Sequence, residues 1–107
     1  MAPVQLLAHA DTAAEFLTAF ANSKRIQIMC EILGRELPVG VIASKVGLSQ
    51  SALSQHLARL RNLGLVHTRR DKQTIYYSCG SEDVRRLFKA LDDIFADDDE
   101  RAVSDKR

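Results

Sequence analysis

Apolar residues recur at helical spacing in the first half of the chain and predict three short helices there. The first is expected to start at Thr12, which has Glu15 three residues later as in a capping box, and to end near Ala21. The second is expected over residues 24–33 and the third over residues 39–46. The residues expected to cap or end the second and third helices are Asn22, Gly34 and Gly47. The expected buried positions of the second helix are Ile26, Ile28, Met29, Ile32 and Leu33.

A fourth predicted helix begins after Ser49, a capping residue, and has two faces of different character. Leu53, Leu57 and Leu60 recur at helical spacing and are expected in the core. The opposite face carries hydroxyls, amides and one arginine, namely Gln50, Ser51, Ser54, Gln55 and Arg59. An ordinary solvated helix face is richer in Glu and Lys. A face of this kind can instead enter a DNA major groove and bond base edges and phosphates.

Two strand-like segments follow, residues 65–70 and 73–79, and Asp71-Lys72 between them predicts a tight hairpin. Ile75 and Tyr77 share one strand face and are expected in the core. Ser81 is suited to cap a fifth helix that ends near residue 95. The order is helix, helix, helix-turn-helix, β-hairpin, helix. The predicted fold class is therefore mainly α with a small β-hairpin, a winged helix-turn-helix.

The chain has 107 residues, which suits one domain. The expected division is a flexible arm over residues 1–9, one domain over 10–96, and a charged, disordered tail over 97–107. No apolar run is long enough to cross a membrane, and no signal peptide is expected. Two cysteines are too few for a disulfide scaffold and fit a reducing cytoplasm.

The net charge of +1 hides an asymmetry along the chain. Residues 45–74 contain six cationic side chains and one acidic side chain, a net charge of +5. Residues 82–100 contain eight acidic and three cationic side chains, a net charge of −5. A polyanion is therefore expected to approach the middle of the chain and to be repelled by its end.

These features together resemble the ArsR/SmtB family of bacterial repressors from about Ala13 to Phe95. The matching stretches are FANSKRIQIM at 20–29, LSQSALSQHLARLR at 48–61, and the hairpin with GLV at 64–66, Arg69-Arg70 and QTIYY at 73–77. Within the family the chain is most similar to NolR-type regulators, and it is also similar to the thiol-sensing branch that includes HlyU and BigR. The resemblance implies a cytoplasmic, nucleoid-associated repressor that binds a double-stranded DNA operator.

If the fourth predicted helix is the recognition helix that enters the DNA major groove, each of its polar side chains has an expected role. Gln50, Ser51 and Gln55 are expected at base edges and backbone, and Ser54 and Arg59 at phosphates. His56 lies between the two helix faces, where a helix-packing or phosphate role is expected rather than metal binding. The capping Ser49 begins a first turn whose N–H groups can hold a phosphate. The alternative is a polar face that is merely solvated.

The hairpin is expected to act as a DNA-binding wing with a basic tip. Its candidate contacts are Arg69, Arg70, Lys72, Gln73 and Thr74. Arginine favours a narrow minor groove, where the potential is most negative. The alternative is a charged turn that only keeps the chain soluble.

The first and fifth helices carry more apolar surface than a small monomer needs. The residues concerned are Phe16, Leu17, Phe20, Leu87, Phe88, Leu91, Ile94 and Phe95. They form either intramolecular core or, as the resemblance implies, a two-fold dimer interface. A homodimer would place two recognition helices about 34 Å apart on an inverted repeat.

Neither metal site of the metal-sensing relatives is expected. The stretch corresponding to one site, residues 36–40, lacks a thiol, and the fifth helix has aspartates but no histidine. Thiol-sensing relatives place a cysteine where Cys30 lies and a partner late in the fifth helix, where this chain has Ala96. Cys30 is thus a redox candidate, whereas the alternative treats Cys30 and Cys79 as small apolar groups. A disulfide between them needs Cα atoms within about 7 Å.

No catalytic constellation is expected, because no serine has the strand-turn-helix setting of a hydrolase nucleophile. No cofactor is expected, and the sequence identifies no small-molecule effector. Two other hypotheses remain beside a plain repressor. One is a repressor switched by oxidant or persulfide at Cys30. The other is a winged helix that binds an acidic protein, which the Gln/Ser face disfavours because protein hot spots favour Trp, Tyr and Arg.

Overall fold

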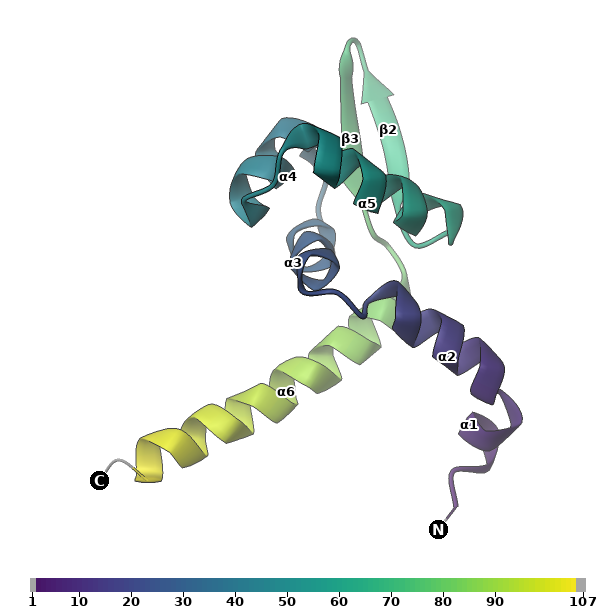
Figure 1. Ribbon diagram of the computed structural model, residues 1–107, viewed down its shortest axis with the longest axis vertical. Helices are drawn as coiled ribbons and strands as arrows, with labels where there is room; N and C mark the ends of the chain where they lie inside the picture. The colour runs from purple at the N-terminus through teal and green to yellow at the C-terminus, as the bar shows by residue number, and fades with distance from the viewer. Residues whose placement is uncertain (1, 106–107) are drawn as a thin grey trace.

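A computed structural model describes the backbone of residues 2–105 and the side chains of residues 2–98. Most of the chain is helical, with one small antiparallel sheet, which confirms the predicted fold class (Figure 1). In chain order the elements are α1 Val4–Ala8, α2 Ala10–Ala19, α3 Ser23–Ile32, β1 Leu37–Pro38, α4 Val39–Val46, α5 Gln50–Asn62, β2 His67–Asp71, β3 Thr74–Ser78 and α6 Glu82–Asp105. Within the described residues, no helix has the length and apolar character needed to cross a bilayer.

Side-chain caps fix the starts of three helices where the sequence predicted them. Asn22 accepts a hydrogen bond from the N–H of Arg25 at 3.1 Å and starts α3. The hydroxyls of Ser49 and Ser81 accept equivalent bonds at 3.1 and 3.2 Å and start α5 and α6. Each bond satisfies an N–H that the first helical turn leaves without a partner.

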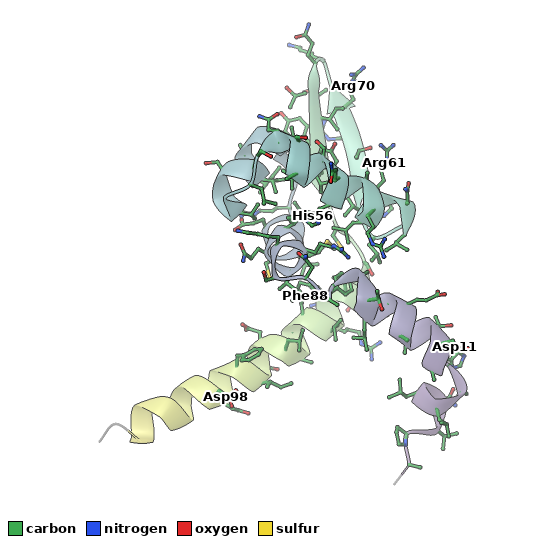
Figure 2. All side chains as sticks on the ribbon, in the orientation of Figure 1. Asp11, His56, Arg61, Arg70, Phe88 and Asp98 are labelled. Atoms are coloured by element: carbon green, nitrogen blue, oxygen red, sulfur yellow. The ribbon has the colours of Figure 1, made fainter. Side chains whose placement is uncertain are left out.

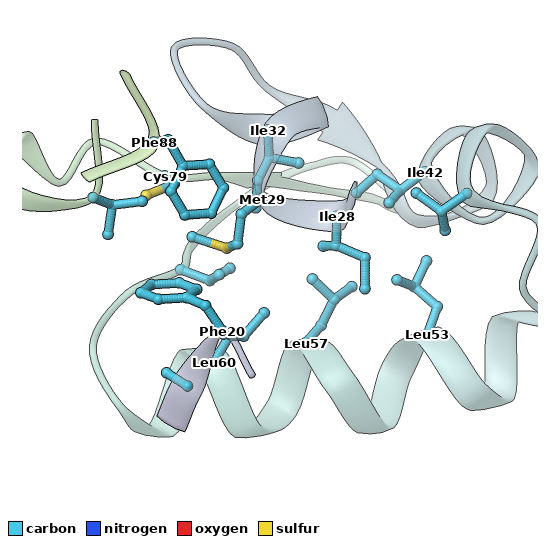
Figure 3. Packing of buried hydrophobic residues seen from close by; sticks show 14 of the residues in the cluster. Phe20, Ile28, Met29, Ile32, Ile42, Leu53, Leu57, Leu60, Cys79 and Phe88 are labelled. Atoms are coloured by element: carbon cyan, nitrogen blue, oxygen red, sulfur yellow. The ribbon is translucent and has the colours of Figure 1, made fainter. Parts of the chain in front are cut away.

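The core lies between α3, α4 and α5, and the sheet and the start of α6 close it. Figure 3 shows side chains of α3 pointing at those of α5. The predicted inner face of α5 is buried, since Leu53, Leu57 and Leu60 are each at most 1% exposed. The fully buried residues of α3 are Ile28, Met29 and Ile32. Burying such side chains stabilises the fold by about 1.5–3 kcal/mol each.

The sheet has the order β1-β3-β2, so the predicted hairpin gains a third, very short strand. Asp71 pairs with Thr74, which leaves Lys72-Gln73 as the two-residue loop. The predicted loop, Asp71-Lys72, is therefore wrong by one residue. Lys72 has a φ of 59°, as the first loop residue of a tight hairpin commonly needs.

Both ends of the chain are more helical than predicted. Residues 4–8 form α1 within the segment predicted as an arm, and α2 begins at Ala10, so Thr12 is not an N-cap. α6 continues to Asp105 instead of ending near residue 95. No glycine or proline interrupts residues 82–105, so nothing in the sequence stops the helix. The prediction of a disordered tail is therefore wrong for residues 97–105, which belong to α6, and its last two residues, 106–107, lie outside the described residues.

Burial departs from prediction at a few apolar positions. Ile26 and Ile75 are 37% and 36% exposed, although both were expected in the core. Ile26 lies on the side of α3 that borders α6, and Ile75 is near the hairpin tip, beyond the reach of the helices. Tyr77, by contrast, packs against the core as expected.

Candidate nucleic-acid interface

The outer face of α5 presents the polar side chains that the sequence singled out. Gln50, Ser51, Ser54, Gln55 and Arg59 are all exposed, on the side away from the buried leucines. Arg59 lies towards the end of the helix, where it borders a groove with Glu15 and Leu63. The amides and hydroxyls near the start of α5 thus share one helix face and are open to solvent.

The turn before α5 is held by backbone and side-chain bonds. Gly47 has a φ of 70°, a left-handed conformation that costs glycine little. The N–H of Leu48 donates to the carbonyl of Ala43 at 3.1 Å. From α3, the ammonium of Lys24 donates to the carbonyl of Val46 at 2.6 Å and so satisfies the end of α4. The role of Lys24 is not visible in the sequence, because its partner is 22 residues away.

His56 occupies the helix-packing position between α5 and α3. It is half-buried, and its Nδ1 lies 3.4 Å from the Nε of Arg25. Arg25 also donates from Nη1 to the carbonyl of Ala19 at 3.3 Å. One guanidinium therefore joins the end of α2 to the middle of α5, and His56 lies off the exposed polar face (Figure 2).

The β2–β3 hairpin, called the wing below, projects beyond the helices (Figure 1). Its five candidate contacts, Arg69, Arg70, Lys72, Gln73 and Thr74, are all exposed. The Nε of Arg69 lies 2.8 Å from a carboxylate oxygen of Glu36, and its guanidinium lies 4.7 Å from the ring centre of Tyr76. The hydrogen bond to Glu36 raises the pKa of Arg69.

The basic and acidic parts of the chain are also apart in space. α5 and the wing lie on one side of the molecule, and α6 runs away from them in the opposite direction (Figure 1). On α6, Arg85 pairs with Glu82, and this hydrogen bond lowers the pKa of that carboxyl group. A second pair joins Lys89 to Asp93 at 3.5 Å. The negative charge of α6 is therefore far from the surface that would face a polyanion.

The predicted dimer residues divide into buried and exposed sets. Phe20 and Phe88 are 5% and 8% exposed and pack edge to face at 5.3 Å, so they belong mainly to the core of the protomer. Phe16, Leu87 and Leu91 are half-buried. The exposed members are Leu17, Ile94 and Phe95, at 54%, 54% and 62%. An apolar groove between α3 and α6 adds Ile26, Leu33 and Cys30 to this surface.

The two cysteines are free thiols in different settings. Cys30 is exposed at the groove, and partial burial together with the charges of Glu31 and Asp92 raises its pKa. Cys79 is buried, and burial raises its pKa as well. A raised pKa lowers the thiolate fraction at neutral pH, and the thiolate is the reactive form of a cysteine. The described residues include no group of three or more His, Cys, Asp or Glu side chains placed to hold a metal ion.

Comparison with known proteins gives consistent matches. The family model for bacterial regulatory proteins of the arsR family matches residues 22–68. The nodulation protein NolR of Rhizobium meliloti is 55% identical over 97 residues, which cover 91% of this chain and 79% of that protein. The transcriptional activator HlyU of Vibrio cholerae is 49% identical over 79 residues, covering 74% and 73%. The crystal structure of the transcriptional repressor BigR from Xylella fastidiosa has a TM-score of 0.82 at 30% identity, covering 89% and 97%.

Proposed function

The chain belongs to the ArsR family of bacterial regulatory proteins and is a DNA-binding transcriptional regulator; on that premise, we propose that it is a homodimeric repressor of an inverted-repeat operator. The observation that carries the proposal is the exposed amide and hydroxyl face of α5, beside a basic wing. Amides bond two atoms of one adenine edge, and hydroxyls bond either bases or phosphates. Repression follows when the bound dimer blocks access to a promoter in the bacterial cytoplasm.

The dimer is proposed on physical grounds as well as on family membership. A single recognition helix contacts only a few base pairs, which is too few to define one site in a genome. The exposed apolar residues Leu17, Ile94 and Phe95 offer a surface on which two copies can pair with closed two-fold symmetry. Two helices about 34 Å apart then contact successive major grooves on one side of the duplex.

Selection of bound duplexes from a random library tests the operator, and fluorescence anisotropy then tests the residues. Gln50→Ala and Gln55→Ala are each expected to weaken operator binding by about 1–3 kcal/mol and to relax base preference. Gln27→Ala, at an exposed glutamine of α3, is the matched control and should leave the affinity unchanged.

Two results would contradict the proposal. Equal losses on operator and random duplexes for the glutamine variants would exclude direct base readout by those residues. Absence of DNA binding even at low salt would favour a protein-interaction module, because the nonspecific electrostatic term is strongest there.

A further inference from the structure

The two adjacent arginines of the wing lie on opposite faces of the sheet. Arg69 pairs across the ladder with Tyr76, and Arg70 pairs with Ile75. Successive side chains of a strand alternate between faces, so Arg70 shares a face with Tyr77, two positions along β3 from Ile75. Tyr77 packs against the core, which lies on the side of the sheet covered by the helices. Arg70 therefore faces the side of α5, and Arg69 faces away from it.

Arg69 already has partners on its own face. Its ladder neighbour Tyr76 is paired in turn with Pro38 of β1, and Glu36 lies two residues before Pro38. The Glu36 carboxylate at 2.8 Å and the Tyr76 ring at 4.7 Å hold the guanidinium from two directions. A tyrosine face attracts a cation, so the two contacts reinforce each other. Arg69 therefore already has an acidic partner on its own face of the sheet before any DNA arrives.

Arg70 has a different environment. It is exposed, and no hydrogen bond or ion pair to it is found among the described residues. Figure 2 shows it beside the distal part of the hairpin, above the level of α5. A cation without a protein partner, on the side of the recognition helix, can release a counterion from a phosphate at little cost.

We propose that Arg70 supplies the phosphate contact of the wing, and that Glu36 acts as a positioning residue that keeps Arg69 on the outer face of the sheet. This inference rests on the proposed function, because it assigns roles within the same DNA-binding surface. The proposal gives different roles to Arg69 and Arg70, which the sequence presents as equivalent.

The test compares Arg69→Ala with Arg70→Ala, which change the net charge equally and so serve as controls for each other. The affinity for operator DNA is measured by anisotropy at several salt concentrations. Arg70→Ala is expected to reduce the slope of log K against log salt by about two per dimer. At 0.15 M salt this corresponds to a loss of roughly thirtyfold. Arg69→Ala should leave the slope unchanged and weaken binding less than about threefold, because on this assignment Arg69 contacts no phosphate and the exposed ion pair that is lost stabilises the fold little.

The double variant Glu36→Arg/Arg69→Glu tests the positioning role, since it reverses the ion pair at constant net charge. It is expected to keep the wild-type slope. If Arg69 contacted a phosphate, the new carboxylate would lower both the slope and the affinity. Circular dichroism melts check that each variant is folded.

Equal slopes for Arg69→Ala and Arg70→Ala, or a lower slope for the charge swap, would overturn the assignment while leaving DNA binding intact. A wild-type protein that bound operator and random duplexes equally would instead remove the proposed function. The two failures are therefore distinguishable.

Discussion

Phe95→Ala provides a quantitative test of the homodimer. Phe95 lies seven residues after Phe88 on the same side of α6, but it is 62% exposed whereas Phe88 is 8% exposed. Full burial of a phenylalanine side chain is worth about 1.5–3 kcal/mol, so Phe95 has about 1–2 kcal/mol left to gain from a partner. A two-fold interface contains two copies of each contact, which gives about 2–4 kcal/mol per dimer. The dimer dissociation constant should therefore rise roughly 30- to 900-fold.

Sedimentation velocity over a dilution series measures this constant directly. Phe88→Ala is the matched control, because its ring packs edge to face on Phe20 inside the protomer. It should lower the free energy of unfolding by about 3–5 kcal/mol. Phe95→Ala should instead keep the far-ultraviolet dichroism of the wild type. A Phe95→Ala protein with an unchanged dissociation constant would show that this surface is not the interface. A wild-type protein that stayed monomeric at all concentrations would refute the dimer itself.

Two further predictions concern the thiol and a helix cap. Because the pKa of Cys30 is raised, its alkylation by iodoacetamide at pH 7.5 should be slower than that of glutathione, and the rate should still increase above pH 9. Mass spectrometry measures the alkylation rate. A rate faster than that of glutathione would support the redox hypothesis. Asn22→Ala should lower the free energy of unfolding by about 1 kcal/mol in urea titrations, because the N–H of Arg25 loses its acceptor. Asn22→Asp retains an acceptor and should be nearly neutral, so equal losses for both variants would contradict the capping argument.

Features set by neighbouring residues could be predicted from the sequence. Asn22, Ser49 and Ser81 cap helices because each side chain reaches an N–H only three residues away. The buried leucines of α5 follow from helical period alone. Local signals also misled at Thr12, where the preceding residues, Ala10 and Asp11, are equally able to continue a helix.

Contacts between distant parts of the chain could not be predicted in this way. Glu36 and Arg69 are 33 residues apart, and Arg25 and His56 are 31 residues apart. Only the fold brings them together, so the sequence presented both wing arginines as free. The exposed polar face of α5 needed no such information, because it depends on the period of one helix. This is why the residues of the candidate site could be predicted better than their partners.

The strand β2 lies at one edge of the sheet, so one side of its backbone has no neighbouring strand in the described structure. Exposed strand edges recruit other strands and lead to aggregation unless charged side chains discourage them. Arg69, Arg70 and Asp71 supply those charges along β2. Variants in which Arg69 and Arg70 are replaced to abolish DNA binding are therefore also expected to self-associate more readily. Light scattering should accompany every such binding measurement, and glutamine, which stays polar, is a safer replacement than a β-branched residue.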